Sequence, residues 1–382
     1  QIKVTMVEDL SRCRPFAGAS NRTAIIYLEN RVATTYPVPY FLWTNLSYIS
    51  RGAGQADRTV IPLVAEPVDA KDATSPWITY RRSCRDGLRK ILGSSPYRAR
   101  EGANTGGANG ILWVEVVDRP GSGLVRVRNL AEAGRKKVAV TEAVIEETLV
   151  YPLLKGNDLD RWRAHPSASI ILTQDPLTRR GISLGVMARS FPRTLAYLEQ
   201  YEHELRNRAA YRRYFREDDP FYSMFNVGEY TLGQYKTVWH RLGDRMKAAV
   251  VEGGQKPIIP QETHTLVACE SRDEAWYLAG VLNSLPVEYT LSSYSMVGGK
   301  SFAGPNLLEF IRVPLYTASP LQVEIVRIAC QVAGGSVPDS SLTEAVARLF
   351  GLGDSELNEM RKGWEEIGLT PLAFHSNRVS SK

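Results

Sequence analysis

The chain has 382 residues, of which 43% are hydrophobic and 23% charged, the composition of an ordinary globular protein with room for two domains. Its net charge of +6 and pI near 9.0 suit a polyanionic partner without requiring one. No apolar run reaches the roughly 20 residues that cross a bilayer, and the first residues lack the regions of a signal peptide. The chain begins without Met and enters an alternating strand at once, so we expect it to belong to something longer.

The cysteines are few and scattered. There is no Cys-x-x-Cys pair and no His at zinc-ligand spacing, which argues against a metal site and suits a reducing cytosol.

Residues 1–45 are predicted to be rich in strands, with the run Ala24 to Leu28 as a buried strand. Pro37 and Pro39 exclude a central strand or a helix interior there and suggest an extended exit. A Gly- and Asp-rich stretch, "RGAGQADRT", has the composition of a linker, and a charged helix is expected near 80–92.

Residues 95–190 alternate short strands with turns and predict a sheet-rich module; the expected strands are "ILWVEVVD", "LVRVRNL", "KKVAV" and "SIILT". A helix near 193–216 follows, with Leu195, Leu198 and Leu205 on its core side, and then the strands "YKTVWHRL" and "HTLVACE" and the helix "RDEAWYLAGVLNS". After about 317 the pattern is helical, and Ser341 with Glu344 is typical of a capping box.

Two segments concentrate positive charge. "YRRSCRDGLRK" carries four arginines and Lys90 against one acid, and "RNRAAYRRYFR" carries five arginines, no acid and three aromatic residues. Each is either a solvated helix face or a surface that contacts phosphate. Guanidinium groups interleaved with aromatic rings favour phosphate contact and base stacking.

The stretch "DDPFYSMF" (residues 218–225) contains Asp-Pro-Phe-Tyr, which differs by one residue from Asp-Pro-Pro-Tyr. Asp-Pro-Pro-Tyr is the motif with which amino-methylating DNA enzymes hold a flipped base. In such a motif the tandem prolines fix the direction of a carbonyl, whereas here the second proline is replaced by Phe221. The stretch also follows a basic helix and not a buried parallel strand. An Asp-Pro turn that leads into a strand with aromatic packing is therefore favoured over a catalytic role.

The glycine-rich segments do not have the context of a nucleotide site. "GANTGGANG" precedes a predicted strand instead of following one, "VAGGSVPD" follows an amphipathic helix, and neither ends in Gly-Lys-Ser/Thr. Both are interpreted as loops, and no self-contained active site is predicted.

Several segments in order resemble the adenine-N6 DNA methyltransferases of restriction-modification systems. "RPFAGASNRTAIIYLENRVATTYPVPYFLW" resembles the end of their catalytic domain. Five further segments resemble the TaqI-like target-recognition region of these enzymes: "GANTGGANGILWVEVV", "YPLLKGNDLDRW", "PRTLAYLEQYEHEL", "DPFYSMFNVGEYTLGQYKTVW" and "VGGKSFAGPNLLEFIRVPL". The segment "LTEAVARLFGLGDSEL" resembles their helical end. The donor-binding Gly-rich motif and the Asn-Pro-Pro-Tyr motif of this family would both lie upstream of Gln1.

The resemblance implies a mixed α+β chain in which the last strands of a methyltransferase-type sheet precede a mixed-sheet target-recognition domain and C-terminal helices. The expected parts are a catalytic-domain remnant at 1–50, a linker and basic helix at 51–94, a DNA-specificity domain at 95–316 and a helical segment at 317–382. It implies no cofactor and no metal for this chain, and S-adenosylmethionine for the parent enzyme. It also implies the cytoplasm of a bacterium or archaeon, with nucleoid DNA as the partner and no membrane.

The resemblance suggests roles for particular residues. Phe16 occupies the position of an aromatic that stacks on the flipped adenine, or else packs under its loop. Asn104 and Asn109 are candidates for pairing with base edges, or else turn residues at left-handed positions. Lys300, in Gly298-Gly299-Lys300-Ser301, lies either in a DNA-contacting loop or in a simple turn. The remaining candidates for phosphate contacts are Arg81, Arg82, Arg85, Arg212, Arg213 and Lys236.

The predicted function is sequence-specific recognition of double-stranded DNA as the specificity portion of such a methyltransferase, with this chain alone inactive. The alternative is a stand-alone specificity or adaptor subunit that recruits a separate catalytic or nuclease chain. A third possibility is that the Arg-aromatic helix binds RNA or single strands.

Overall fold

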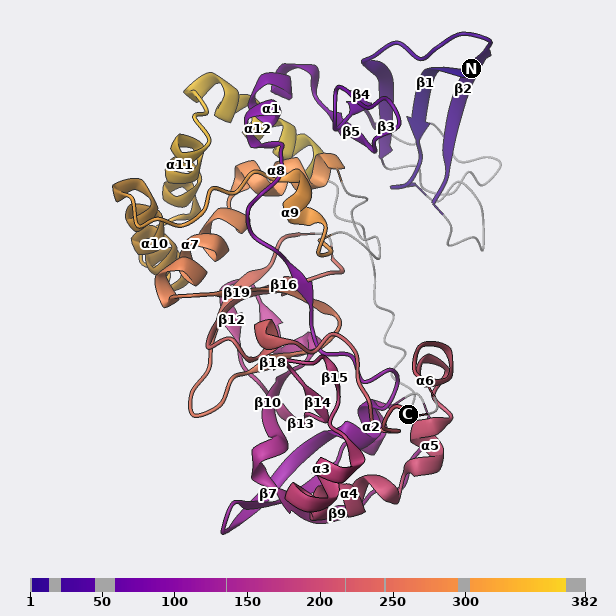
Figure 1. The fold of residues 1–382 in the computed structure, drawn as a ribbon. Helices are drawn as coiled ribbons and strands as arrows, with labels where there is room; N and C mark the ends of the chain where they lie inside the picture. The colour runs from indigo at the N-terminus through magenta and orange to yellow at the C-terminus, as the bar shows by residue number, and fades with distance from the viewer. Residues whose placement is uncertain are drawn as a thin grey trace, which may run out of the picture. The chain divides into compact units, whose positions relative to one another are not determined.

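The computed structural model describes residues 2–13, 22–44, 59–134, 136–216, 218–243, 245–294 and 303–368. The chain divides into two units that are each assembled from separate segments. Unit 1 comprises Gln1–Gly93, Leu285–Ser295 and Ala347–Lys382, and unit 2 comprises Ser94–Ser284 and Met296–Val346. Figure 1 shows their elements, and the mixed α+β class is confirmed.

Unit 1 is built on a five-stranded sheet in the order β2-β1-β3-β4-β5. Its strands are β1 (Ile2–Asp9), β2 (Ala24–Asn30), β3 (Val38–Thr44), β4 (Thr59–Pro67) and β5 (Trp77–Tyr80). β1 pairs with β3 in parallel, and the other neighbours are antiparallel. The accompanying helices are the short 3-10 turn η1 (Arg82–Cys84), α1 (Arg85–Ile91), α8 (Leu285–Tyr294) and α12 (Asp354–Gly368).

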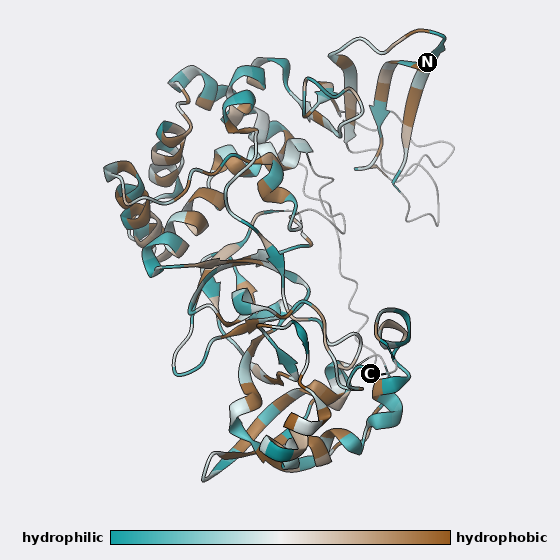
Figure 2. Ribbon diagram, viewed as in Figure 1, coloured by the Kyte–Doolittle hydropathy of each residue, from teal (hydrophilic) through white to brown (hydrophobic). Residues whose placement is uncertain are grey.

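The strand β2 departs from the prediction of a buried run. All seven of its residues are exposed, and Ile26 and Leu28 keep 55% and 59% of their surface. The reason is its place in the sheet: β2 is an edge strand that pairs only with β1 among the described strands. Its hydrophobic stretch is brown in Figure 2. An apolar run therefore predicted the strand correctly but not its burial.

The linker predicted in "RGAGQADRT" lies outside the described residues except for Thr59, and the rest of the segment 51–94 contains strands as well as the basic helix. Its described residues 59–94 supply β4 and β5, which pair along β3 and along each other, before the chain turns into η1 and α1. The helix expected near 80–92 is confirmed. Gly87 on α1 allows α12 to approach, since a Cβ there would lie 3.0 Å from the Met360 methyl group.

Unit 2 contains a six-stranded sheet in the order β18-β10-β13-β7-β8-β9. Its strands are β7 (Trp113–Gly121), β8 (Leu124–Asn129), β9 (Glu142–Glu146), β10 (Val150–Leu154), β13 (Ala168–Ile171) and β18 (Ile259–Pro260). One apolar core joins this sheet to the helices that follow it, and Leu112, Val127, Ile170, Leu198 and Leu205 lie fully buried in it. Those helices are α2 (Asn109–Leu112), α3 (Leu184–Ser190), α4 (Pro192–Glu199), α5 (Glu202–Arg206) and α6 (Ala209–Tyr214).

A second sheet of unit 2 has the order β17-β16-β19-β6. It is formed by β6 (Arg100–Glu101), β16 (Tyr235–His240), β17 (Ala248–Glu252) and β19 (His264–Cys269). The helix α7 (Arg272–Leu282) packs against this sheet and against α10 (Pro320–Ala333). Gly280 permits the helix contact, since a Cβ there would lie 3.1 Å from the Ala329 methyl group.

Smaller elements complete the described chain. They are β11 (Leu159–Asp160), β12 (Arg163–Ala164), β14 (Gln174–Asp175), β15 (Arg180–Gly181), α9 (Leu307–Phe310), α11 (Asp339–Leu349) and the 3-10 turns η2 (Ala131–Ala133), η3 (Glu147–Leu149), η4 (Gly156–Asp158) and η5 (Glu229–Leu232). In Figure 2 the helices α10, α11 and α12 alternate between hydrophobic and hydrophilic bands, as amphipathic helices do.

Several predictions of local structure differ from the structure. Pro39 lies within β3, the middle strand of the sheet in unit 1, so the exclusion of a central strand there is wrong; the strand accommodates the proline because its pairing with β1 begins only at Tyr40. The single helix expected at 193–216 is divided into α4, α5 and α6. The expected strand at 136–140 has no regular structure in its described residues, and the strand of that region is β9. The capping box expected at Ser341 is wrong because α11 already begins at Asp339, whereas a capping box does close the start of α10 at Ser319.

Candidate nucleic-acid interface

The short helix α6 presents arginines to solvent from unit 2. Arg212, Arg213 and Arg216 are exposed, and no carboxylate lies within ion-pair distance of them among the residues that the structure describes. Arg213 lies over the ring of Tyr214, 5.1 Å from its centroid, and this ring is 63% exposed. An exposed ring flanked by unpaired guanidinium groups is what phosphate contact and base stacking require.

A buried arginine holds this surface in place. Arg208 is 4% exposed, and its guanidinium donates to the carbonyl oxygens of Leu205 (2.8 Å), Thr105 (2.5 Å) and Phe221 (2.7 Å). Burial lowers the pKa of Arg208 to about 10. The charge is therefore satisfied by three carbonyl dipoles, and these join α5, the glycine-rich loop and the residue that follows Pro220.

The glycine-rich segment 102–110 is a packed loop. A Cβ at Gly102 would overlap the carbonyl oxygen of Gln261, and Gly106 and Gly107 have left-handed backbone angles with φ of +65° and +100°. The loop also pairs with Phe225, because the backbones of Asn104 and Phe225 exchange two hydrogen bonds (3.0 and 2.8 Å). The segment thus supports the residues beside α6 and does not cradle a phosphate, in agreement with its interpretation as a loop.

The two asparagines of this loop make the local hydrogen bonds of turn residues. The side-chain oxygen of Asn104 accepts from the backbone N–H of Gly106 (2.7 Å), and that of Asn109 accepts from the hydroxyl of Thr105 (2.5 Å). Neither is at a left-handed position, which the glycines take instead. Both side chains are half-buried, so base-edge contact by them stays a prediction.

The stretch "DDPFYSMF" serves the core. Phe221, Tyr222 and Met224 are buried at 2% exposure or less, and the Tyr222 hydroxyl donates to the Ile182 carbonyl (2.7 Å). A turn forms where Ser223 N–H donates to the Pro220 carbonyl (2.9 Å), as the Asp-Pro pair predicts. No strand follows it, and only Phe225 forms a bridge. Phe221, Tyr222 and Met224 therefore pack in the protein interior, as the turn interpretation of this stretch predicts.

The other predicted basic helix lies in unit 1 and is engaged differently. Arg85 (3.2 Å) and Arg89 both pair with Glu66, whose side chain is 5% exposed. Arg81 pairs with Glu366 on α12 (2.6 Å), and Lys90 pairs with Glu356 (2.7 Å). Burial would raise the pKa of Glu66, but hydrogen bonds donated by its neighbours, Arg89 and Arg85 among them, hold it below the ordinary value. Arg82 is exposed and has no ion-pair partner in the described chain.

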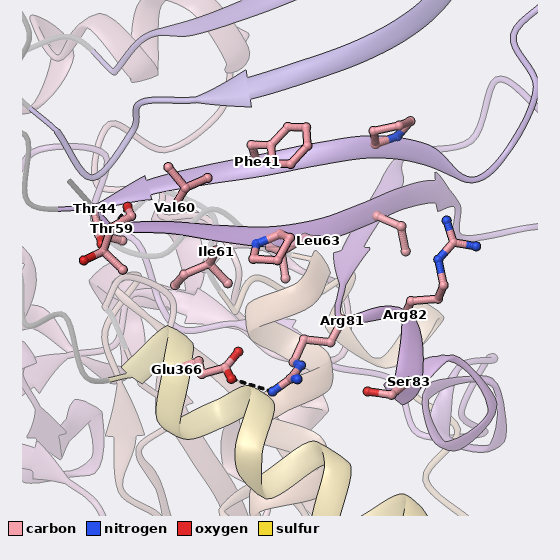
Figure 3. A pocket seen from close by; sticks show the side chains of 13 residues that line it. Phe41, Thr44, Thr59, Val60, Ile61, Leu63, Arg81, Arg82, Ser83 and Glu366 are labelled. Carbon is pink, nitrogen blue, oxygen red and sulfur yellow. Dashed lines mark hydrogen bonds and ion pairs between the residues drawn. The ribbon is translucent and has the colours of Figure 1, made fainter.

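A cavity of about 830 Å³ adjoins that helix within unit 1. Apolar side chains of β3 and β4 line it, including Phe41, Ile61 and Leu63. Figure 3 shows the Arg81 guanidinium directed at Glu366 while Arg82 points away from that pair. The one carboxylate in the lining of this cavity, that of Glu366, is already paired with Arg81. The lining therefore has no free acid that could bind a ribose, and it resembles an uncovered face of a sheet more than a nucleotide site.

The predicted contact of Lys236 with phosphate is wrong, because this side chain is buried. It is 0% exposed on the central strand β16, and its ammonium group donates to the carbonyl oxygens of Gly233 and Ile258 (3.1 Å for the latter). Burial lowers its pKa to about 7. Both faces of β16 are covered, since Lys236, Thr237, Val238 and Trp239 are all buried, and a basic residue type alone did not reveal that.

Two other candidates, Phe16 and Lys300, lie outside the described residues. The described residues contain no group of three or more His, Cys, Asp or Glu that could hold a metal ion. No described helix is long and apolar enough to cross a membrane. The four cysteines form no disulfide with one another, and Cys13, Cys84 and Cys269 are buried.

The structural role of Arg208 was not predicted from the sequence, although a signal was present. Arg208 stands three residues after the buried Leu205 and three before the buried Tyr211, which places it on the inner side of the helical pattern. No motif predicted a role for Arg100 or Arg179, which come from separate segments and line a pocket beside α6.

Comparison with known proteins gives structural neighbours only. No family model matches the sequence, and no curated protein matches it. The chain is similar to the Type IIL restriction-modification enzyme MmeI, solved in complex with DNA, with a TM-score of 0.49 and 11% identity over 96% of this chain and 46% of that one. It is also similar to the type IIG restriction endonuclease BpuSI, with a TM-score of 0.34 and 9% identity over 95% of this chain and 44% of that one. The chain spans less than half the length of either enzyme.

Proposed function

We propose that this chain recognises specific sequences in double-stranded DNA, as the specificity portion of an S-adenosylmethionine-dependent adenine-N6 DNA methyltransferase of a restriction-modification or phage-defence system. The observation that carries the proposal is the α6 surface, where Arg212, Arg213 and Arg216 have no ion-pair partner among the described residues, lie beside an exposed tyrosine and are anchored by the buried Arg208. The resemblance of the sequence to that family supplies the finer assignment.

The division of labour follows from the residues. The α6 arginines position the duplex through its phosphates, and the loop that carries Asn104 and Asn109 lies next to them to meet base edges. The methyl donor is bound by the part of the catalytic half that lies outside this sequence, and residues 1–50 form the end of that half. Phe16, at the end of that half, stacks on the flipped adenine.

Selection of bound sequences from random duplexes tests the proposal directly. We expect an enriched motif, and calorimetry of the same protein with S-adenosylmethionine alone should give no binding heat. Failure to bind duplex DNA at all would refute the function, and donor binding by this chain would refute the division of labour.

A second function, an adaptor that recruits a separate catalytic or nuclease chain, is favoured by one observation. The apolar edge strand β2 is exposed along its whole length, and an uncovered edge offers unpaired backbone groups to a strand of another chain. Co-purification from the native host followed by native mass spectrometry separates the two functions. A separate partner chain bound through unit 1 supports the adaptor, and one continuous reading frame with a catalytic half excludes it.

A further inference from the structure

A cavity beside α6 combines ring faces with unpaired guanidinium groups. It has a volume of about 640 Å³, in the range of small-ligand sites, and Arg100, Arg179, Tyr214, Phe225, Asn226 and Tyr230 line it. All of these belong to unit 2. We call it the Tyr214–Tyr230 pocket.

The two outer rings of the pocket form a corner. Tyr214 and Phe225 meet edge to face, with centroids 6.0 Å apart and planes at 88°. The ring centroid of Phe225 also lies 4.6 Å from that of Phe215. Because the Tyr214 ring is 63% exposed, a flat heterocycle can lie on one ring while its edge meets the other.

Polar and charged groups also line the pocket, among them the carboxylate of Glu101, which pairs with Arg241 (2.9 Å). Neither Arg100 nor Arg179 has a carboxylate within ion-pair distance in the described chain, and Arg100 lies over the ring of Tyr230 at 5.8 Å. The Asn226 amide donates to Glu101 (2.9 Å), which leaves its carbonyl oxygen as an acceptor at the rim. Burial raises the pKa of Tyr230, so its hydroxyl remains a donor at neutral pH.

The pocket is held in shape before any ligand arrives. Phe225 is fixed by its two backbone bonds to Asn104, and a Cβ at Gly106 would lie 2.9 Å from the Phe225 ring, so only glycine fits beneath it. Asn226, next in sequence, has a left-handed φ of +56°, a conformation that asparagine tolerates. Arg208 fixes the start of α6 and thereby Tyr214. Such preorganisation reduces the entropy lost on binding.

We propose that the Tyr214–Tyr230 pocket receives one nucleobase unstacked from a DNA strand, with the base on the Tyr214 and Phe225 rings and the flanking phosphates on Arg100 and Arg179. This inference rests on the proposed function, since it takes DNA as the partner. Ring faces favour any base, guanidinium groups favour the strand backbone, and the amide and hydroxyl at the rim favour the polar edge of a base over an apolar ligand.

The test uses the full chain with duplexes that carry one mismatched pair, because a mispaired base is cheaper to unstack. Wild type should bind the mismatched duplex more tightly than the matched one. Tyr214→Ala should lose about tenfold in affinity for the mismatched duplex, in line with the removal of one stacking contact. Tyr214→Phe keeps the ring and should restore binding to within about twofold of wild type. The salt dependence should be the same in all three proteins, because no charge changes.

Photocrosslinking gives an independent readout. A 5-iodouracil placed at the mismatch should crosslink to Tyr214 or Phe225, as located by mass spectrometry. If Tyr214→Ala binds both duplexes as wild type does and no crosslink reaches these rings, the pocket is refuted while duplex recognition stands. If wild type binds no duplex, the proposed function fails, and single-stranded oligonucleotides then decide the pocket: a crosslink at Tyr214 or Phe225 supports it, and its absence overturns it.

Discussion

The helices α1 and α6 carry comparable positive charge in sequence but differ in what that charge does. Arg81, Arg85 and Lys90, on or beside α1, each face a carboxylate of the same unit. Around α6, Arg212 and Arg213 are exposed and have no carboxylate within ion-pair distance in the described chain. Charge on a helix therefore indicates a partner only after internal acids are accounted for, since a paired guanidinium has already lost much of its attraction for phosphate.

The largest effect should follow from removing the anchor of α6. Arg208→Met leaves three carbonyl groups of the interior without a donor, so we expect a loss of about 3 to 5 kcal/mol in the free energy of unfolding, measured by urea denaturation. Arg206→Met is the matched control: its ion pair with Glu202 is exposed on α5, and we expect a loss of less than about 0.5 kcal/mol. Equal losses in the two variants would contradict the anchoring role.

The next effect concerns the acid between the α1 arginines. Glu66→Gln should destabilise the protein by about 2 kcal/mol at neutral pH, because two arginines lose a buried counter-ion while remaining partly hydrated. The pKa of Glu66 is depressed in the fold, so its contribution is present above the pKa of the unfolded chain and is lost as pH falls below it. Stability measured from pH 7 to pH 3 should fall less steeply in Glu66→Gln than in wild type; identical slopes would contradict this assignment.

A comparable effect on DNA binding should follow from the α6 arginines. If about six phosphates are contacted, the slope of log affinity against log salt is near −5, and replacing both Arg212 and Arg213 by alanine should reduce it to about −3. The affinity near 0.15 M salt should fall about 30-fold. Fluorescence anisotropy over a salt series measures both quantities, and an affinity of wild type that does not vary with salt would discard the phosphate contacts.

The smallest effect is expected on the paired helix. Arg81→Ala and Arg85→Ala should each change DNA affinity by less than about threefold, since each arginine is already held by Glu366 or Glu66. The same anisotropy assay applies. A loss as large as that of the α6 variant would erase the distinction between the two helices and place unit 1 on the DNA.

Much of the secondary structure was predictable because it follows local patterns. The strands β16 and β19, the apolar face of α10 and the basic helix at α1 all follow from local residue patterns. The exposure of β2 was not predictable from the sequence, because the burial of a strand depends on which other strands pair beyond it. Nor was the inward direction of Lys236, since a basic residue on a strand is assigned to solvent unless both faces are known to be covered.

The candidate site was predictable only in part. Arg212 and Arg213 stood out because no acid accompanies them in sequence. Arg100, Arg179 and the stretch from Phe225 to Tyr230 are three segments that only the tertiary fold brings together, through β6, the turn after β14 and the bridge at Asn104. Long-range pairing of this kind leaves no periodic trace in the sequence.

The three bonds of Arg208 also bear on how recognition could be re-engineered. Its guanidinium ties the backbone of Thr105 to that of Leu205 and Phe221, so the glycine-rich loop and α6 are parts of one mechanical piece. Grafting a new loop between Gly102 and Gly110 without the matching helix would leave a buried cation facing the wrong carbonyls. Exchange of DNA specificity between such chains should therefore succeed when residues 102–110 and 205–226 are transplanted together, and fail when either travels alone.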